Sequence, residues 1–395
     1  MISDRLDELT DYPFPRLDAL IADLEPPAGE TPMLMWIGEP RHGVPEIARA
    51  PLASRFDDYG RYPPVEGTPG LRDAIAAWLG RRFKLPEGMI EPGRHILPVT
   101  GTREALFMVA LVAVPSEKAG KRPAVLMPNP FYQPYKGGAV AAGAEPVYAS
   151  CGPDTGFLPD LDALDPEILE RTALFYLCTP ANPQGAVASR AYLRRLVDLA
   201  RRYDFTLASD ECYTEIYDRE PPPGVLEICA EDGDFSNVVA FHSLSKRSGV
   251  PGLRSGFVAG DPQFIKAFVR LRKYAAAGSP FAALDTAERL WRDEAHVEVN
   301  RQLYRDKIDI AERILGNRFG FFRPPGGFFL WLDVGDGERA ARTLWSKAAV
   351  KVLPGAYLAA DGPDGQNPAE SFIRVALDND VETTREALTR LADVL

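Results

Sequence analysis

One lysine, Lys246, follows two hydroxyl side chains at the end of an apolar run, and this grouping could do covalent chemistry. Residues 238–241 are typical of a buried strand, and Ser243, Ser245 and Lys246 follow them. Arg254 comes eight residues later, among glycines. A lysine amine can hold a phosphate-bearing aldehyde as a Schiff base, while Ser, Arg and backbone N–H groups hold the phosphate. The alternative is a surface loop that carries Lys and Arg side chains.

Further polar side chains follow other apolar runs that are typical of strands. Asn182 comes after residues 174–178, and Asp210 and Tyr213 end the run that begins at residue 205. Tyr132 lies in an aromatic loop after a run that begins at residue 125. In an open α/β sheet, ligands bind at the carboxyl ends of the strands. We therefore expect these side chains to cluster at one edge of a sheet, although turn chemistry or simple packing could explain each alone.

Three further positions suit the binding of anions. Backbone N–H groups of Gly101, Thr102 and Arg103 would point into a turn before a helix, with Thr100 or Thr102 as its N-cap. Gly38 ends an apolar strand and could offer a bare N–H. Arg374 interrupts an apolar strand, so it needs an acidic partner or an anionic ligand.

The composition narrows the class of protein. The 395 residues carry a net charge of -11 and no basic block, which disfavours nucleic acid and anionic membrane surfaces as partners. The four cysteines lack metal-ligand spacing, so we expect no metal site and buried thiols in a reducing compartment. No signal peptide and no apolar run of membrane-spanning length is evident, which favours a cytoplasmic protein.

The order of the elements predicts the fold class. Strands alternate with helices from about residue 95 to 275, which indicates an α/β domain with a mainly parallel sheet. The tail changes character: a long helical stretch at 282–315 precedes strand-like pieces at 326–333, 350–354 and 371–377, and a helix follows Asp380. We expect this tail to form a smaller α+β domain.

Together these motifs resemble the class I/II aminotransferases, which are fold-type I pyridoxal-phosphate enzymes. The matching features are Gly38 in IGEP, Tyr62 in YPPVEGTPGLR, Gly101 and Thr102, Asn182 in NPQG, Asp210 and Tyr213 in SDECY, SLSKRSGVPGLRSG around Lys246, and Arg374. Within that family the motifs WIGEP, GTREALF, PNPFYQ and DEAHVEVNRQLYRDK look most like the N-succinyldiaminopimelate aminotransferases. Two places depart from that pattern. Gln184 stands where those enzymes usually have threonine, and the run 274–280 is less polar than theirs.

The resemblance implies an architecture and an assembly. Residues 45–285 would form the large cofactor-binding domain, with a mainly parallel mixed sheet flanked by helices. Residues 286–395 would form the small α+β domain, joined by the N-terminal segment 1–44. The family also implies a homodimer with shared active sites, and small amino-acid and keto-acid substrates.

The resemblance also assigns roles to residues. Lys246 would bind pyridoxal 5'-phosphate covalently and move protons, Asp210 would pair with the ring nitrogen, and Asn182 and Tyr213 would contact the ring's phenolate oxygen. Tyr132 would stack on the ring. The phosphate would be held by Ser243, Ser245, Arg254, the N–H groups of Gly101, Thr102 and Arg103, and Tyr62 of the other subunit. The substrate α-carboxylate would meet Arg374, Gly38 and Asn182, and Arg41 is our candidate for a distal carboxylate.

The implied reaction exchanges an amino group between glutamate and N-succinyl-2-amino-6-oxopimelate, a step of lysine biosynthesis through diaminopimelate. Three alternatives remain open: an aminotransferase for aspartate, alanine or an aromatic keto acid, a β-lyase or synthase with the same cofactor, and a cofactor-binding regulator. The regulator is disfavoured because no helix-turn-helix segment or basic arm precedes the domain.

Overall fold

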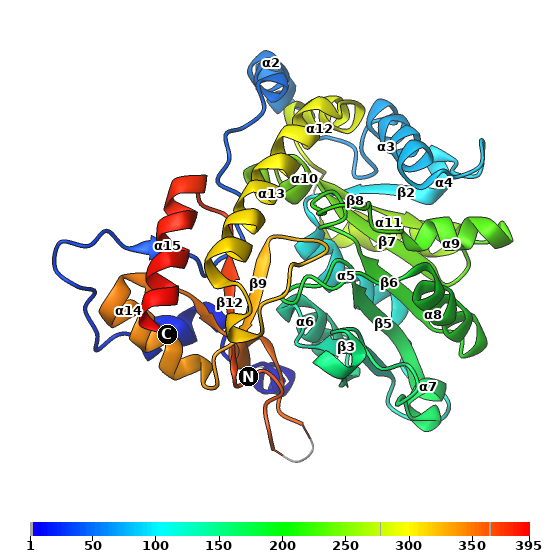
Figure 1. Ribbon diagram of the computed structural model, residues 1–395. Helices are drawn as coiled ribbons and strands as arrows, with labels where there is room; N and C mark the ends of the chain where they lie inside the picture. Colours follow the sequence, from blue (N-terminus) through cyan, green and yellow to red (C-terminus); the bar gives the residue numbers. More distant parts are fainter. Residues whose placement is uncertain (1–2, 277, 363–364) are drawn as a thin grey trace.

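A seven-stranded mixed sheet forms the centre of the larger part of the molecule (Figure 1). The computed structural model describes residues 3–276, 278–362 and 365–395. The strands, in spatial order, are β2 (Ile96–Val99), β8 (Gly256–Gly260), β7 (Val238–Ser243), β6 (Thr206–Asp210), β5 (Thr172–Cys178), β3 (Ala124–Asn129) and β4 (Glu145–Ser150). Only β8 runs antiparallel to its neighbours, so the expectation of a mainly parallel α/β sheet is confirmed.

Helices cover both faces of this sheet because its strands are apolar on both faces. Within β5, Leu174 and Tyr176 pack into one core, whereas Phe175 and Leu177 pack into the other. The helices of this part are α3 (Pro69–Phe83), α4 (Pro92–His95), α5 (Thr102–Ala113), α6 (Gln133–Ala141), α7 (Pro166–Arg171), α8 (Arg190–Arg202), α9 (Val225–Asp232), α10 (Leu244–Arg247), α11 (Pro262–Ala275) and α12 (Phe281–Arg292). The first of the two cores lies under α5, α6 and α11, and the second lies under α3, α8, α9 and α12.

A smaller α+β part lies beside the large sheet (Figure 1). Its antiparallel sheet has the order β11 (Leu353–Pro354), β12 (Phe372–Ala376) and β9 (Phe329–Asp333). Its helices are α13 (Ala295–Leu315), α14 (Gly337–Ala348) and α15 (Val381–Val394). Helix α15 begins after Asp380, whose side chain caps it, as the sequence predicts.

The N-terminal segment packs on this smaller part. Strand β1 (Met33–Leu34) pairs in parallel with β10 (Val350–Lys351). Helix α1 (Pro13–Leu20) buries Leu17 in a cluster that includes Trp331 and Leu353, and α2 (Arg49–Ser54) lies beside α12. The division at residues 44 and 285 stays a proposal; helix α12, which packs on the large sheet, extends past residue 285 to Arg292.

Two local expectations were wrong. The helical stretch 282–315 is broken between Arg292 and Ala295. The buried guanidinium of Arg247 donates there to the carbonyl oxygens of Leu290, at 2.7 Å, and Asp293, at 3.1 Å, so it satisfies acceptors that a helix end leaves free. The N-cap of α5 is Gly101 rather than a threonine.

The side chain of Thr100 is engaged elsewhere, because its hydroxyl donates to Glu104 Oε2 at 2.6 Å. All four cysteines are free and buried, as expected. Among the described residues, no helix combines the length and the apolar character needed to cross a membrane.

We expect Arg247→Met to lower the free energy of unfolding by about 2–4 kcal/mol, because it leaves buried carbonyl groups without a donor. Denaturant titration would measure this loss, with the exposed Arg270→Met as the matched control. Equal stability of the two variants would contradict the assigned role of Arg247.

Candidate active site

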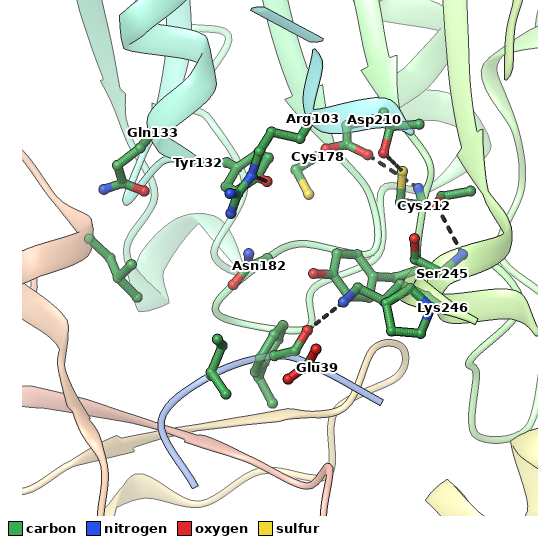
Figure 2. Close-up of a pocket in the computed structure, with 18 of the residues that line it drawn as sticks. Glu39, Arg103, Tyr132, Gln133, Cys178, Asn182, Asp210, Cys212, Ser245 and Lys246 are labelled. Atoms are coloured by element: carbon green, nitrogen blue, oxygen red, sulfur yellow. Dashed lines mark hydrogen bonds between the residues drawn. The ribbon is translucent and has the colours of Figure 1, made fainter. Parts of the chain in front are cut away.

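A cavity of about 380 Å³ lies where the carboxyl ends of the large sheet face the smaller part and the N-terminal segment. Figure 2 shows its lining side chains converging from these elements. The residues predicted from the sequence that line it are Gly38, Thr102, Arg103, Tyr132, Asn182, Asp210, Tyr213, Ser243, Ser245, Lys246, Arg254 and Arg374. Most of the candidate residues therefore line one cavity, as expected from the tendency of ligands to bind at the carboxyl ends of the strands in an open α/β sheet.

Lys246 lies in α10, directly after β7. Ser243 caps this short helix, since its Oγ accepts a hydrogen bond from the Ser245 N–H at 3.1 Å. The Lys246 amine donates to the carbonyl oxygen of Gly38, as the dashed line in Figure 2 shows. Burial lowers the pKa of Lys246 to about 8. A larger fraction of the amine is therefore neutral near neutral pH, which makes it a better nucleophile than an exposed lysine.

Asp210 ends β6 and lines the same cavity, next to Cys212 in Figure 2. Its Oδ2 accepts a hydrogen bond from the Tyr135 hydroxyl at 2.7 Å, and its Oδ1 accepts one from the Cys212 N–H at 3.3 Å. Burial raises the pKa of Asp210, and these donors oppose that rise. A cationic ring nitrogen in the cavity would stabilise the ionised carboxylate.

Arg374 enters the cavity from β12 without a carboxylate partner among the described residues. Its Nη1 donates to Asn182 Oδ1 at 3.0 Å, and its Nη2 donates to the carbonyl oxygen of Trp36 at 2.8 Å. Its buried Nε has no hydrogen-bond partner in the described structure. Burial lowers the pKa of Arg374 to about 10, which still leaves it charged at neutral pH. A buried, unpaired guanidinium at a cavity favours a carboxylate ligand.

An anion cradle lies at the start of α5. Gly101 has a φ of +94°, and a Cβ there would lie 2.1 Å from Nη2 of Arg254. Position 101 therefore requires glycine, both for its backbone conformation and for the approach of Arg254. The N-terminus of the twelve-residue helix, Arg254, and the hydroxyls of Ser243 and Ser245 face the same cavity. This set fits a phosphate group.

Tyrosines complete the walls of the cavity. The Tyr132 hydroxyl accepts a hydrogen bond from Arg103 Nε at 2.8 Å, and burial raises the pKa of Tyr132 to about 12. Tyr213 packs edge-on against Phe328 and Phe329, and burial raises its pKa as well. Together the lysine, the buried acid, the aromatic walls and the anion cradle fit pyridoxal phosphate, which combines an aldehyde, a basic ring nitrogen and a phosphate.

Three of the predicted residues do not line this cavity. Gly101 lies next to Arg254, which lines the cavity. Arg41 donates instead to Asn379 Oδ1 at 3.0 Å. The side chain of Tyr62 is fully exposed in the single chain, at 99%. The roles assigned to Arg41 and Tyr62 stay predictions.

Neither Gln184 nor the described residues of the run 274–280 line this cavity. Gln184 is buried, and its Nε2 has no hydrogen-bond partner in the described structure. Tyr274 is exposed, and residue 277 of the run 274–280 lies outside the described residues.

Sequence reasoning missed several residues of the cavity. Tyr12, Phe14 and Glu39 line it from the N-terminal segment, and Tyr135 supports Asp210 from α6. The motif around Tyr12 is visible in the sequence, but only the folded path of the segment brings it to the cavity.

A family model described as aminotransferase class I and II matches residues 30–391. Among curated proteins, an LL-diaminopimelate aminotransferase of Desulforudis audaxviator is 30% identical, over 99% of this chain and 97% of its own length. A 4-dedimethylamino-4-oxo-anhydrotetracycline transaminase of Streptomyces rimosus is 31% identical, over 90% of this chain and 91% of its own length.

Solved structures show the same similarity. An aminotransferase from Neisseria meningitidis Z2491 has a TM-score of 0.94 and 39% identity, with 99% of each chain covered. The aminotransferase AspB from Helicobacter pylori 26695 has a TM-score of 0.89 and 32% identity, with 98% of each chain covered. The similarity therefore extends over nearly the entire chain.

We expect Gly101→Ala to weaken the binding of pyridoxal phosphate by about 10- to 100-fold, because the new Cβ displaces Arg254 from the cradle. Fluorescence titration of the cofactor-free protein measures this affinity. Gly252→Ala is the matched control, since a Cβ there meets no atom within 4 Å. Comparable affinities of the two variants would argue against the cradle.

We also expect the covalent reaction of the cofactor-free protein with pyridoxal phosphate to accelerate as the pH rises through about 8. The folded pKa of Lys246 is lowered to about 8, so its neutral, reactive amine becomes the major form above that pH. Stopped-flow absorbance follows the reaction. A rate that rises only near pH 10 would show that burial does not activate this lysine.

Proposed function

This chain belongs to the class I and II aminotransferases, and we propose that it exchanges an amino group between glutamate and the keto form of N-succinyl-diaminopimelate. As a member of this family it is an aminotransferase whose cofactor is pyridoxal 5'-phosphate. One observation carries the proposal: the Lys246 amine, the Asp210 carboxylate and the unpaired Arg374 guanidinium line a single cavity.

The cofactor supplies an aldehyde that binds amines and a conjugated ring that delocalises the electrons of a carbanion. Lys246 would hold the aldehyde, and its Nζ would accept the proton from the substrate α-carbon when the substrate amine takes its place. Asp210 would accept a hydrogen bond from the ring nitrogen and favour its protonated form. Asn182 and Tyr213 would hold the ring near its phenolate oxygen, and Tyr132 would lie against its face.

Arg374 orients the substrate. Its guanidinium binds the α-carboxylate through two hydrogen bonds, so that the α-carbon proton faces Lys246. Asn182, already 3.0 Å from Arg374 Nη1, fixes the guanidinium on one side. The N–H of Gly38 lies on the same segment as the Trp36 carbonyl that fixes it on the other side.

The N-succinylated substrate is supported by the motifs that this chain shares with that type of aminotransferase. A second candidate substrate is LL-diaminopimelate itself, because a relative of that activity is 30% identical over nearly the full chain. The two substrates differ at the distal amine, which is free and cationic in one and acylated in the other. We further propose a cytoplasmic homodimer in which Tyr62 reaches the phosphate of the partner subunit.

A spectral titration of the purified holoenzyme tests reaction and substrate together. We expect glutamate to change the absorbance of the bound cofactor, and 2-oxoglutarate to restore it. N-succinyl-LL-diaminopimelate should then react with a kcat/KM about tenfold or more above that of LL-diaminopimelate. The reverse order would establish the second candidate, and reaction with aspartate, alanine or aromatic donors alone would refute both.

Lys246→Ala should abolish turnover and the absorbance band of the covalently bound cofactor, because the described lining of the cavity contains no other lysine. Circular dichroism would verify that the variant is folded. Turnover at the rate of the unaltered enzyme would contradict the role of Lys246 as the amine that binds the cofactor.

A further inference from the structure

The motif DEAHVEVNRQLYRDK, residues 293–307, contributes no side chain to the lining of the active-site cavity. Most of it lies in α13, and one face of this helix contacts the turn that carries Lys246. We propose that Asn300 and His42 are positioning residues that fix the direction in which Lys246 presents its amine to the cavity. This inference rests on the proposed function only in that Lys246 is the amine that binds the cofactor, and it holds for any amino-acid substrate.

Asn300 holds the backbone of this turn. Its Nδ2 donates to the carbonyl oxygens of Lys246, at 3.0 Å, and Arg247, at 3.3 Å. Both carbonyls belong to α10, which is a single turn of helix, so they need partners from outside the helix. Asn300 is 7% exposed, and little water can reach its amide. The side chain of Asn300 therefore determines how the lysine turn is oriented.

His42 fixes the orientation of the Asn300 amide. Carbonyl oxygens only accept hydrogen bonds, so the NH2 group of Asn300 faces the lysine turn and its Oδ1 faces His42. The His42 Nδ1 lies 2.7 Å from this Oδ1 and therefore carries the proton. The His42 Nε2 then accepts from the Lys307 amine at 2.8 Å. Burial and the nearby charge of Lys307 lower the pKa of His42, so its ring is neutral at neutral pH and keeps this arrangement.

The N-terminal segment thus holds Lys246 at both ends. The Lys246 amine donates to the carbonyl oxygen of Gly38. The Lys246 carbonyl oxygen is held by Asn300, which His42 orients from four residues beyond Gly38. Because a lysine side chain is a flexible four-carbon stem, one fixed end alone would leave the other free to occupy many positions. Once the amine leaves Gly38 to bind the aldehyde of the cofactor, the backbone anchor is the contact that still restricts its reach.

A second contact from the same helix supports the turn. His296 lies one helical turn before Asn300, and its Nδ1 donates to Asp293 Oδ2 at 2.5 Å. Its Nε2 accepts from the Ser248 hydroxyl at 2.8 Å. Ser, His and Asp follow one another here as in a hydrolytic triad, but Ser248 is 1% exposed and does not line the active-site cavity. These contacts therefore support the end of α10 behind Lys246.

The covalent reaction of the cofactor-free protein with pyridoxal 5'-phosphate tests the proposal without turnover. In this reaction the Lys246 nitrogen bonds to the aldehyde carbon, and the aldehyde oxygen leaves as water. Pyridoxine 5'-phosphate has an alcohol in place of the aldehyde, so it presents the same ring and phosphate but forms no bond with the amine. We expect Asn300→Leu to lower the maximal covalent rate, reached above a pH of about 8, by about 10- to 100-fold. The affinity for pyridoxine 5'-phosphate should change less than about twofold, because only the amine is misplaced.

Two variants of His42 separate the orientation of the amide from the loss of packing. His42→Phe keeps a ring that can pack against Tyr304 but removes both nitrogens. The Asn300 amide can then turn, and the covalent rate should fall by about 3- to 10-fold. His42→Asn offers an amide N–H near the position of Nδ1, so it should restore the rate to within about twofold of that of the unaltered protein.

Gln302→Leu is the matched control, because it removes an exposed amide from the same helix and should change neither the rate nor the affinity. An unchanged covalent rate in Asn300→Leu, or an equal loss of rate and of affinity for pyridoxine 5'-phosphate, would overturn the positioning role. If Asn300→Leu does not fold, the two His42 variants decide by the same criteria. An unaltered protein that forms no covalent bond with pyridoxal 5'-phosphate would overturn the proposed function of Lys246 instead.

Discussion

The burial of one amine determines much of this structure. Lys246 can act as a nucleophile near neutral pH because the surrounding protein disfavours its charged form, and the turn that carries it must therefore be held firmly. Arg247 anchors that turn to the end of α12, and Asn300 donates to the carbonyl oxygen of Lys246 at 3.0 Å. Asn300 also contacts His42, which contacts Lys307, so a buried polar chain continues into the smaller part. The reactive group is thus positioned by contacts from three regions of the sequence.

The cavity around the amine holds charges that are poorly compensated without ligands. Burial raises the pKa of Asp210 and lowers that of Arg374, which means that the protein environment disfavours the charged form of each. A cationic ring nitrogen beside Asp210 and a carboxylate on Arg374 would remove both penalties. A ligand that binds only the folded protein also raises its free energy of unfolding.

The sequence was most informative where chain order and sheet topology coincide. Lys246, Asp210 and Asn182 follow three neighbouring parallel strands. Because the carboxyl ends of parallel strands meet at one edge of the sheet, these residues can be placed together without knowledge of side-chain packing. Contacts between distant segments were not foreseeable in this way. Tyr135 meets Asp210 across 75 positions and Tyr12 meets Arg103 across 91, and no local pattern encodes either pair.

One local error also came from a contact between distant segments. The break before Ala295 depends on a buried arginine from another helix, and helix propensity alone does not reveal it. Side-chain direction is likewise not encoded by position along the chain. Arg41 follows Gly38 closely in the sequence, and its guanidinium donates to Asn379 in the fold, so its proposed contact with the substrate stays a prediction.

The backbone around Gly38 accepts hydrogen bonds from two side chains of the active site. The carbonyl of Gly38 accepts from Lys246, and the carbonyl of Trp36, two residues earlier, accepts from Arg374. A single stretch of backbone therefore touches the cation that binds substrate and the amine that reacts. The position of this stretch therefore affects the orientation of both side chains at once, so a substitution that shifts it would disturb the substrate-binding cation and the reactive amine together.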